Sequence, residues 1–570
     1  MNLQHLPPGS LMMLGALLVP LIPRKYQAWY ALILPILSGI HLLTNFQDGF
    51  VFDTTFMGYA LQPVRVDRLS LIFGYIFHIA AFLSGLFALK VDDPIQHLSG
   101  MVYAGAAIAA AFCGDLISLF IFWELTAITS VFLIWAARTE SATRTGVRYL
   151  VIQVGSGVIL LAGTLLHYQE TGSIAFEHFM QADGSMTQGA WWIFVGVGIK
   201  AAFPCLHNWL QDAYPKATYS GTVYLSAFTT KLAIYALARG FAGNELLIPI
   251  GCVMTAFPIF FAVIENDLRK VLAYSLNNQL GFMVVAIGIG TELAVNGACA
   301  HAFAHIIYKG LLFMAMGAVL YRVGTTKASE LGGLHRTMPW TTVFCIIGAM
   351  SISAFPFLSG FSAKSLITSA AGHEGMVLVT FVLLFASAGV MEHSGIKIPF
   401  FAFFAHDSGK RPKEAPWNML AAMGIASALC IGIGVYPRAL YDLLPYATDY
   451  NAYDVTHVVT QLELLLFAAL AFALLLKFGA YPAEVKSINL DFDWFYRKVA
   501  PSFIQSSVSL MKDIANAALA PIKARFDGTG NKMMAMWGLD GKSSQAGAES
   551  GASALWAALL LCAFLILFYI

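Results

Sequence analysis

Stretches of about 20 apolar residues recur along almost the whole 570-residue chain. A helix of that length, rising about 1.5 Å per residue, crosses the roughly 30 Å hydrocarbon core of a bilayer. Backbone N–H and C=O groups in lipid must pair within the protein, which leaves helices and closed barrels as spanning structures. A barrel would show short segments of strict alternation, whereas these runs are long and continuous. The sequence therefore predicts an all-α polytopic membrane protein.

The apolar runs predict about 14–16 transmembrane helices. The expected spans cover 9–23, 28–45, 69–90, 99–113, 115–136, 147–167, 190–211, 219–240, 246–264, 271–289, 296–320, 340–356, 361–404, 417–436, 458–478 and 553–570. The first 23 residues lack a basic start and an A-x-A-like cleavage site. We therefore interpret them as a retained first span and not as a signal peptide.

Two of these segments carry signs of a broken helix. Pro204, in GIKAAFPCLHNWL, removes a backbone hydrogen bond and is expected to kink or break the seventh span. The segment 361–404 is too long for one crossing, and its first part is predicted to be a half-helix that ends near Gly372 or Gly375. Broken helices inside a membrane are tolerated where they line a cavity, and they often mark ion sites.

Basic residues in the loops predict which side of the membrane each loop faces. Leaving aside the long segment after residue 478, fifteen Lys and Arg residues lie in or beside the odd-numbered loops, and four, Arg65, Arg68, Arg239 and Arg438, lie in or beside the even-numbered loops. Cytoplasmic loops carry the excess of Lys and Arg in membrane proteins. The odd loops are therefore predicted to face the cytoplasm. An even number of spans then places both termini on the outer side.

Composition argues against several kinds of site and partner. Only 11% of residues are charged, against about 25% in soluble domains, and the net charge of +1 suggests no nucleic-acid partner. The seven cysteines are scattered and form no C-x-x-C pair, which argues against iron–sulfur and structural zinc sites. No dinucleotide fingerprint is present. We expect no cofactor and no redox cofactor site in this chain, so any enzymatic role would depend on partner subunits.

Seven ionisable residues lie well inside the expected spans, where a charge on a lone inserted helix costs roughly 2.5–3.5 kcal/mol. They are Glu124, Lys200, Lys231, His301, His305, Lys309 and Lys364. Lys397 is a weaker member, close to a span end, where a long side chain can extend to the interface. Such residues are functional candidates by default. The structural alternatives are an interhelical ion pair for Glu124 and Lys200, and a hydrogen-bonded core histidine for either His taken alone.

His301, His305 and Lys309 follow one another at intervals of four in HAFAHIIYKGLLF. On a helix, each step of four drifts by about 40°, and the three side chains climb about 12 Å along one face. A column of titratable groups along one face is what a proton relay needs. Lysine is a poor metal ligand, and no carboxylate or cysteine accompanies the histidines at ligand spacing. We therefore interpret the three residues as part of a proton path.

Glu124 and Lys200 lie in neighbouring spans, and the second of these spans is expected to be broken. Loss of water favours the neutral form of a lysine, and a nearby carboxylate favours its charged form. Moving Glu124 toward or away from Lys200 would then load or unload a proton. The pair is therefore a candidate switch.

Residues 481–552 are too polar to span a membrane. Phe503, Leu510, Met511, Ile514 and Ala518 recur at helical spacing, which predicts an amphipathic helix on the cytoplasmic surface. Its stretch 495–526 would measure about 48 Å. The sequence from 527 onward, rich in Gly and Ser, is predicted to be a flexible linker to the last span. A plain tether is the structural alternative for the whole region.

Over roughly residues 65–435 the chain resembles a known family of proton-translocating membrane subunits. The resemblance rests on VDRLSLIF, FWELTAI, GIKAAFPCLHNWLQDAYPKA, ENDLRKVLAYSLNNQLGFM, HAFAHIIYKGLLFMAMGAVL, ELGGL and SGFSAKSLI. These motifs are similar to those of the antiporter-like subunits of respiratory complex I, membrane-bound hydrogenases and Mrp-type cation/proton antiporters. The resemblance implies two inverted five-helix repeats, each with a broken helix. It also implies a central proton path through Glu124, Lys200, Lys309 and Lys364, with Lys231 as an additional lysine.

The resemblance also suggests how the chain is divided. N-terminal helices would occupy 1–95, an antiporter-like core 96–405, and C-terminal helices 406–480. The lateral helix and linker would occupy 481–552, and a terminal span 553–570. The family resemblance implies a multi-pass protein of the cell inner membrane.

The leading hypothesis is a proton-translocating subunit of an Mrp-like cation/proton antiporter, because Lys231 and the central motifs resemble the D-type chain of the Mrp antiporters. Its partners would be other membrane subunits, the lipid bilayer and protons, with sodium as a candidate ion. A second hypothesis is a proton-pumping subunit of a redox complex, either NADH:quinone oxidoreductase or a membrane-bound hydrogenase, which the C-terminal tail favours. A third is an ion-coupled inorganic-carbon uptake or scaffold subunit.

Overall fold

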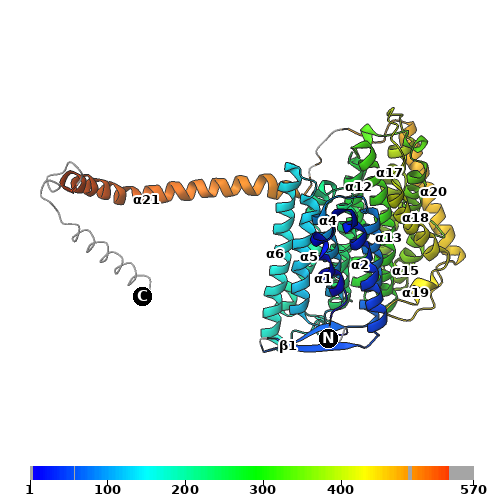
Figure 1. The fold of residues 1–570 in the computed structure, drawn as a ribbon, viewed down its shortest axis with the longest axis horizontal. Coiled ribbons are helices and arrows are strands. Elements are labelled where there is room, and N and C mark those ends of the chain that lie inside the picture. The colour runs from blue at the N-terminus through cyan, green and yellow to red at the C-terminus, as the bar shows by residue number, and fades with distance from the viewer. Residues whose placement is uncertain (1–3, 5, 57, 486–488, 490, 538–570) are drawn as a thin grey trace. The chain divides into compact units, whose positions relative to one another are not determined.

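The computed structural model describes residues 1–570 apart from 1–3, 5, 57, 486–488, 490 and 538–570. The chain falls into two compact units, Met1–Asn489 and Leu490–Ile570. Nearly all secondary structure in the first unit is helical, and its helices form one bundle (Figure 1).

The helices and strands of the first unit follow the expected spans closely. The N-terminal half contains α1 (Ser10–Ala16), η2 (Val19–Leu21), α2 (Arg24–Asn45), β1 (Val51–Phe56), β2 (Tyr59–Arg65), α3 (Arg68–Phe87), α4 (Pro94–Ala111), α5 (Leu116–Trp135), α6 (Glu140–Thr171), α7 (Gln188–Lys200), α8 (Asn208–Ala213), η3 (Tyr214–Lys216), α9 (Gly221–Ala227) and α10 (Thr229–Gly240). The second half of this unit contains α11 (Leu247–Ile264), α12 (Leu268–Ile289), α13 (Glu292–Val323), η4 (Ala328–Glu330), η5 (Leu334–Arg336), α14 (Pro339–Ile352), α15 (Ser359–His373), α16 (Val377–Val390), the π-helical η6 (Met391–Ile396), α17 (Lys397–Pro399), the π-helical η7 (Phe400–Phe404), α18 (Trp417–Val435), α19 (Arg438–Tyr441) and α20 (Val455–Lys477).

The predicted all-α polytopic membrane fold is confirmed. Among the described residues, ten helices are long and apolar enough to cross a membrane. The other expected spans coincide with helices that are shorter, less apolar or interrupted, such as α1, α4, α14 and the pair α7–α8. The last expected span, 553–570, lies outside the described residues. The total of about 14–16 spans therefore stays a prediction.

A small β-hairpin interrupts the helical pattern between α2 and α3. β1 pairs antiparallel with β2, from Val51 opposite Arg65 to Phe56 opposite Tyr59. The hairpin lies at the lower end of the bundle in Figure 1. The sequence analysis did not predict it. Pro63 lies within the second strand, and a proline weakens the sequence signal for a strand because it cannot donate a hydrogen bond to a neighbouring strand.

Two helix breaks have the same construction. Between α7 and α8, Ala202 and Cys205 adopt positive φ values of 61° and 69°. Between α14 and α15, Ala354 and Phe357 adopt positive φ values of 59° and 67°. In each case the first of these residues begins an Ala-Phe-Pro tripeptide, which places a proline between the two left-handed positions. The predicted break at Pro204 is confirmed.

The half-helix predicted at the start of 361–404 is also confirmed. It is α15, which ends at His373, and Gly375 follows it at φ 65°. Lys200 lies just before the first break and Lys364 lies after the second one. The inversion of the two repeats remains a prediction.

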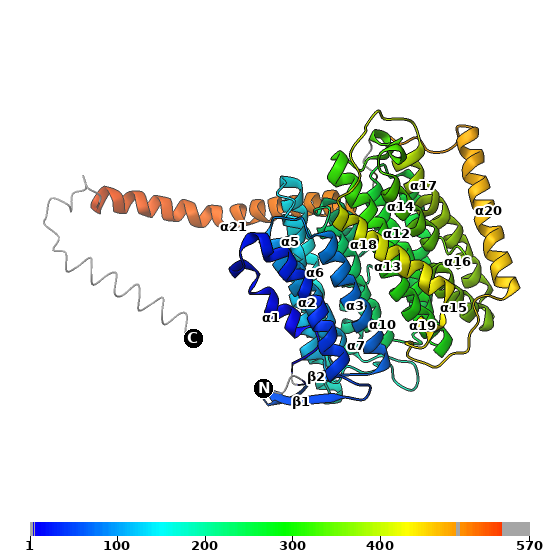
Figure 2. The same cartoon turned by 45° about the vertical axis from the view of Figure 1, so that its right-hand side comes forward.

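The centre of the bundle is formed by α12 and α13, whose apolar windows are 94% buried. α13 packs against α12, α14, α15, α18 and α9. By contrast, only 11% of the corresponding window of α20 is buried, and α20 lies at one edge of the bundle in both views (Figures 1 and 2). A charged side chain on α13 is therefore surrounded by protein, which is where intramembrane charges are tolerated.

The second unit contains η8 (Phe495–Val499) and α21 (Ala500–Trp537). α21 has 38 residues and is about 57 Å long. Phe503, Leu510, Met511 and Ile514 are exposed on it, as an amphipathic surface helix requires. The helix continues past 527, so the expected start of the flexible linker was wrong. Gly528 and Gly530 each reduce helix stability by about 1 kcal/mol relative to alanine. The run MMAM at 533–536 consists of good helix formers, which favours continuation of the helix.

Candidate functional site

Lys200 ends α7 at the first helix break, and its side chain is completely buried. Its Nζ donates to the carbonyl oxygen of Trp123 at 2.6 Å and to Thr126 Oγ1 at 3.1 Å, both on α5. The ammonium also lies 4.4 Å from the centre of the Trp123 ring, within the range of a cation–π contact. The break thus places a lysine where a backbone oxygen and an aromatic face stabilise its charged form.

Glu124 is the residue next to Trp123 on α5 and is close enough to Lys200 for their charges to interact. Glu124 Oε1 has no hydrogen-bond partner among the described residues, and no ion pair between Glu124 and Lys200 is present there. The two predicted residues are therefore neighbours without direct contact. A small change in either side chain could make or break a pair, which is the geometry that the predicted switch requires.

The space for the Glu124 carboxylate is supplied by a glycine. A Cβ at Gly157 of α6 would overlap Glu124 Oε1. Gly155, two residues away on the same helix, faces open space instead. The glycine at 157 therefore has a specific role that the sequence alone did not indicate.

Lys231 is fully buried near the start of α10, three residues after Phe228, which separates α9 from α10. Its Nζ donates to the carbonyl oxygen of Ser226 at 2.7 Å and to Thr230 Oγ1 at 3.3 Å. Ser226 belongs to α9, so this lysine also uses an oxygen exposed by an interrupted helix. Broken helices provide such oxygen atoms because their last carbonyls lack an internal partner.

His301, His305 and Lys309 are fully buried on α13, and we call these three residues the α13 column. The rings of His301 and His305 stack with their centres 6.1 Å apart. His301 Nε2 lies 3.0 Å from the hydroxyl of Tyr308. Both ring nitrogens of His305 and Nζ of Lys309 have no hydrogen-bond partner among the described residues. Buried polar groups are costly in that state, so these groups are suited to exchange protons with water or with one another.

Two side chains that are hydrogen-bonded to the α13 column, directly or through one another, were not predicted from the sequence. Tyr308 adjoins Lys309, and its hydroxyl donates to Gln279 Oε1 at 3.1 Å. Gln279 lies on α12 in the polar run NNQ, which is unusual within a buried span and could have been noticed. These two side chains connect His301 to α12.

The remaining lysines are close to the α13 column. Lys231, Lys309 and Lys364 all lie near enough to His305 for their charges to act on it. The structure therefore brings together residues from α10, α13 and α15, which are far apart in the sequence. Glu124 and Lys200 form a second group on α5 and α7.

Lys364 is buried on α15, and its Nζ donates to the carbonyl oxygen of Ile352 at 2.7 Å. Ile352 is the last residue of α14, so the lysine binds the C-terminal end of a half-helix across the second break. That end carries partial negative charge, which favours a cation. The ammonium also lies 5.1 Å from the centre of the Phe282 ring.

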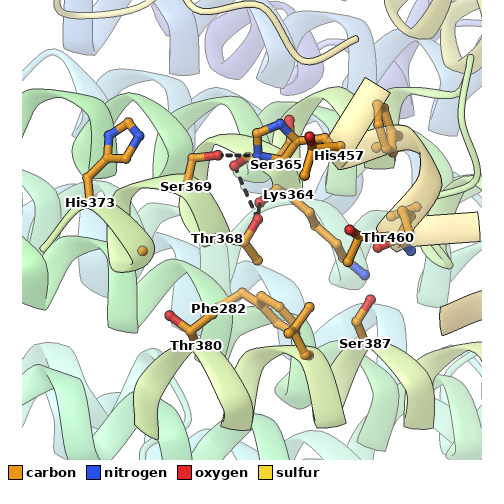
Figure 3. A pocket seen from close by; sticks show the side chains of 16 residues that line it. Phe282, Lys364, Ser365, Thr368, Ser369, His373, Thr380, Ser387, His457 and Thr460 are labelled. Carbon is orange, nitrogen blue, oxygen red and sulfur yellow. Dashed lines mark hydrogen bonds between the residues drawn. The ribbon is translucent and has the colours of Figure 1, made fainter. Parts of the chain in front are cut away.

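A cavity of about 310 Å³ adjoins Lys364 between α15, α16 and α20. Seven hydroxyl side chains line it: Ser365, Thr368, Ser369, Thr380, Ser387, Thr456 and Thr460. Figure 3 shows the Lys364 side chain extending across the cavity toward Ser387. At its far side, Ser369 Oγ lies 2.8 Å from both the Tyr450 hydroxyl and His457 Nε2. We call this space the Lys364 cavity.

Lys397 corrects one sequence-based expectation. It was expected to extend toward the interface as a weaker member of the set, but its side chain is completely buried. Its Nζ forms an ion pair with Glu484 at 2.8 Å and donates to backbone carbonyls at the end of α11. The partner carboxylate lies 87 residues further along the chain, in the segment after α20, where no local pattern could indicate it.

No group of three His, Cys, Asp or Glu side chains that could hold a metal ion occurs within the described parts of the chain. The buried ionisable groups are mainly lysines on carbonyl and hydroxyl oxygen atoms. Such groups can hold or pass on a proton, whereas an ammonium cannot ligate a metal.

Comparison with known proteins gives a consistent result. Residues 113–391 match the family described as NADH:quinone oxidoreductase/Mrp antiporter, TM. The D-type chain of the Na(+)/H(+) antiporter of Alkalihalophilus pseudofirmus is 31% identical over 318 residues, which are 52% of this chain and 64% of that protein. Hydrogenase-4 component B of Escherichia coli is 24% identical over 442 residues, which are 70% of this chain and 65% of that protein. The chain thus spans just under two thirds of the length of these relatives.

Two solved structures share the fold. A chain of the Mrp complex from Dietzia sp. DQ12-45-1b superimposes with a TM-score of 0.71 at 20% identity, covering 80% of this chain and all of that chain. A chain of the archaeal membrane-bound sulfane sulfur reductase superimposes with a TM-score of 0.68 at 24% identity, covering 81% of this chain and 98% of that chain.

The family match contains the helices that carry all seven predicted site residues, from α5 to α15. The two relatives are named as parts of a Na(+)/H(+) antiporter and of hydrogenase-4. The chain is a multi-pass membrane protein whose residues 113–391 match the model of the NADH:quinone oxidoreductase/Mrp antiporter family.

Proposed function

We propose that this chain is the proton-translocating membrane subunit of a multisubunit Mrp-like monovalent cation/proton antiporter. The observation that carries the proposal is a set of ionisable side chains from α5 to α15, of which Glu124 is half-buried and the other six are buried. The set comprises Glu124, Lys200, Lys231, His301, His305, Lys309 and Lys364. A fold has no stability reason to bury this many unpaired charges, and intramembrane ionisable residues mark ion pathways.

The first group would act as a charge-controlled switch. Lys200 rests on the Trp123 carbonyl, and the Glu124 carboxylate lies nearby with one oxygen unpartnered among the described residues. Approach of Glu124 would stabilise the protonated amine, and its withdrawal would favour release of the proton. The broken helix that ends at Lys200 provides the freedom for this movement.

The second group would pass the proton between the halves of the bundle. Lys231, Lys309 and Lys364 repel one another when charged, and His305 is within range of all three. A proton arriving on one lysine therefore promotes release from the next. From Lys364 the proton would reach the Lys364 cavity, whose hydroxyl groups and His457 can hold a chain of hydrogen bonds.

Transport in membrane vesicles tests the proposal. We expect Lys200→Ala to reduce cation-driven proton movement at least tenfold, measured with a pH-sensitive dye in everted vesicles that contain the assembled complex. Lys413→Ala, at an exposed position of the loop after η7, is the control and should leave the rate unchanged. Normal proton movement with Lys200→Ala in an assembled complex would refute the proposal.

A second candidate function is a proton-pumping subunit of a redox complex. It is favoured by the similarity to hydrogenase-4 component B and by the fold shared with a chain of the sulfane sulfur reductase. The same set of side chains would serve, driven by electron transfer in another subunit. Purification through a tag on this chain separates the two: small membrane subunits alone favour the antiporter, and a subunit with metal clusters favours the redox complex.

The proposal includes a location and an orientation. We place the chain in the cell inner membrane with both termini on the outer side, because the Lys and Arg residues of the loops lie on the opposite side. Sodium is the candidate counter-ion, as in the name of the Alkalihalophilus relative. Replacing sodium by potassium in the vesicle assay would identify the cation.

A further inference from the structure

A second buried cluster of charges lies around Lys397, apart from the seven predicted residues. Lys397 Nζ donates to the carbonyl oxygens of Val263 at 2.6 Å and Glu265 at 2.8 Å. Its charge is paired with Glu484 Oε1 at 2.8 Å, and the two side chains are 0% and 8% exposed. The carbonyls belong to the end of α11, so one function of Lys397 is to cap that helix.

Capping does not account for the acids around this lysine. Glu392, on the π-helical segment η6, is close enough to both Lys397 and Glu484 for their charges to interact. Glu392 Oε1 has no hydrogen-bond partner among the described residues. Glu392, Lys397 and Glu484 form what we call the Lys397 cluster. The carboxylates of Glu392 and Glu484 then share one ammonium, that of Lys397. A proton bound to one of the two carboxylates would neutralise the remaining negative charge.

The Lys397 cluster adjoins the α13 column through His393. His393 is completely buried next to Glu392, and its charge would interact with those of Lys309, Lys397 and Lys364. Its Nδ1 lies 2.9 Å from Ser394 Oγ, which donates to Ser275 Oγ at 2.8 Å. Its Nε2 has no partner among the described residues. A histidine with one fixed and one open nitrogen is suited to pass a proton between two lysines.

The cluster also adjoins the protein surface. Glu265 interacts with Glu484 through charge, and its carboxylate forms an ion pair with Lys270 at 2.7 Å. Lys270 is 27% exposed. In both views α17, which begins with Lys397, lies toward the opposite end of the bundle from α19 and the lower end of α15 (Figures 1 and 2). The Lys397 cluster therefore lies toward the opposite end of the bundle from α19.

Glu484 differs from the other members because it comes from outside the helices. It lies in the irregular segment after α20, as does Tyr481, whose ring stacks on Phe401 with centres 6.0 Å apart. Tyr481 also interacts with Glu392. This short segment is thus anchored by an aromatic contact and an ion pair, and an irregular segment can move more easily than a packed helix.

We propose that the Lys397 cluster is a proton-exchange site that joins the α13 column to the surface at the end of α11, with Glu484 as its movable member. When the Lys397 ammonium gives its proton to the Glu484 carboxylate, both become neutral, and the attraction that holds the segment is lost. Glu484 can then carry the proton toward Glu265 and Lys270. The inference rests on the proposed function and adds to the proposed proton path an exchange site near the surface at the end of α11.

Charge-removing variants separate a relay from a structural ion pair. Replacing a buried pair by uncharged side chains of similar volume is often neutral for stability. The double variant Lys397→Met with Glu484→Gln should therefore assemble, and we expect its proton flux in the vesicle assay to fall at least tenfold. A wild-type flux in the double variant would overturn the inference. Asp407→Asn, which removes a carboxylate from the exposed pair with Arg411, is the control and should keep the wild-type flux.

The single variants decide the question if the double variant does not assemble. Glu484→Asp keeps a titratable carboxylate and should retain at least half of the flux, whereas Glu484→Gln should lose at least nine tenths of it. Equal flux in the two single variants would contradict the inference. Lys309→Met reports on the proposed function itself: if it abolishes flux while the Lys397 and Glu484 variants do not, only this inference fails.

Discussion

At the scale of single residues, the path depends on side chains that leave room as much as on those that carry charge. Glu124 can keep its position beside Lys200 only because position 157 on α6 has no Cβ. Glu124 carries the charge, and Gly157, a glycine in an apolar run, leaves the space that the Glu124 carboxylate occupies. Such a dependence is visible only when two helices are seen together.

Gly157→Ala should therefore act like a mutation of Glu124. The added Cβ would overlap the carboxylate and force Glu124 away from its position. We expect proton movement in vesicles to fall about tenfold, equal to about 1.4 kcal/mol of barrier. Gly155→Ala is the matched control, since a Cβ there meets nothing within 4 Å. Equal effects of the two substitutions would mean that helix α6, and not Glu124, is the sensitive element.

Asp67 in the motif VDRLSLIF has a structural role. Its side chain accepts a hydrogen bond from the backbone N–H of Ser70 at 2.8 Å and caps α3. It also pairs with Arg239 at 2.8 Å. Loss of such a cap costs about 1 kcal/mol, and loss of the charged hydrogen bond to Arg239, which keeps Tyr235 as a partner, adds about 1–3 kcal/mol. Asp67→Ala should lower the unfolding temperature of the complex, while Asp53→Ala on the exposed hairpin should not.

The same carboxylate predicts a pH dependence. Burial alone would raise the pKa of Asp67, but its hydrogen bond and charge interaction with Arg239 outweigh burial and hold the pKa below its usual range. The stabilisation is therefore complete at neutral pH and is lost as the pH falls below about 4. The difference in unfolding temperature between the wild type and Asp67→Ala should shrink over that range. A difference that grows on acidification would contradict the assignment.

At the scale of elements, the two helix breaks hold the lysines and use strained backbone to do so. A residue other than glycine in the left-handed region costs of order 1–3 kcal/mol. Cys205 and Phe357 occupy equivalent positions, after the proline of each Ala-Phe-Pro tripeptide. The two breaks thus share one backbone conformation, with two left-handed residues at equivalent positions in each.

Substitutions at Cys205 test that interpretation. Glycine adopts the observed φ of 69° without strain, so Cys205→Gly should keep proton movement and raise the stability of the solubilised complex by up to about 1 kcal/mol. Cys205→Val, with a β-branched side chain, should lower it by about 1 kcal/mol or more. Thermal unfolding of the purified complex measures both. Identical stabilities would show that the strain is relieved elsewhere in the break.

At the scale of the whole molecule, the charge of the loops and the helical order together predict an orientation. Thr55 on the β-hairpin and Lys413 in the loop after η7 are both exposed. In a Cys205→Gly background, Thr55→Cys should react with a membrane-impermeant maleimide in intact cells. Lys413→Cys should react only after the membrane is opened. The reverse pattern would invert the topology and place both termini in the cytoplasm.

The sequence was sufficient for features that depend on periodicity and local chemistry. The intervals of four between His301, His305 and Lys309 predicted one helical face, and Pro204 predicted a break. Contacts between distant segments could not be predicted in this way. The pairing of Lys397 with Glu484 and the fit of Glu124 against Gly157 depend on how helices pack, which no local pattern encodes.

The unbroken helix α13 has a mechanical consequence. It has 32 residues, is about 48 Å long and packs against seven other helices: α3, α9, α10, α12, α14, α15 and α18. A buried helix without an interruption keeps the spacing of its side chains fixed, so the distances between its titratable groups along the helix axis stay constant. Motion is left to rotating side chains and to the interrupted helices around it. We therefore expect that inserting one alanine after Gly310 would turn Lys309 and the two histidines out of register with the helix beyond them and stop transport without unfolding the bundle.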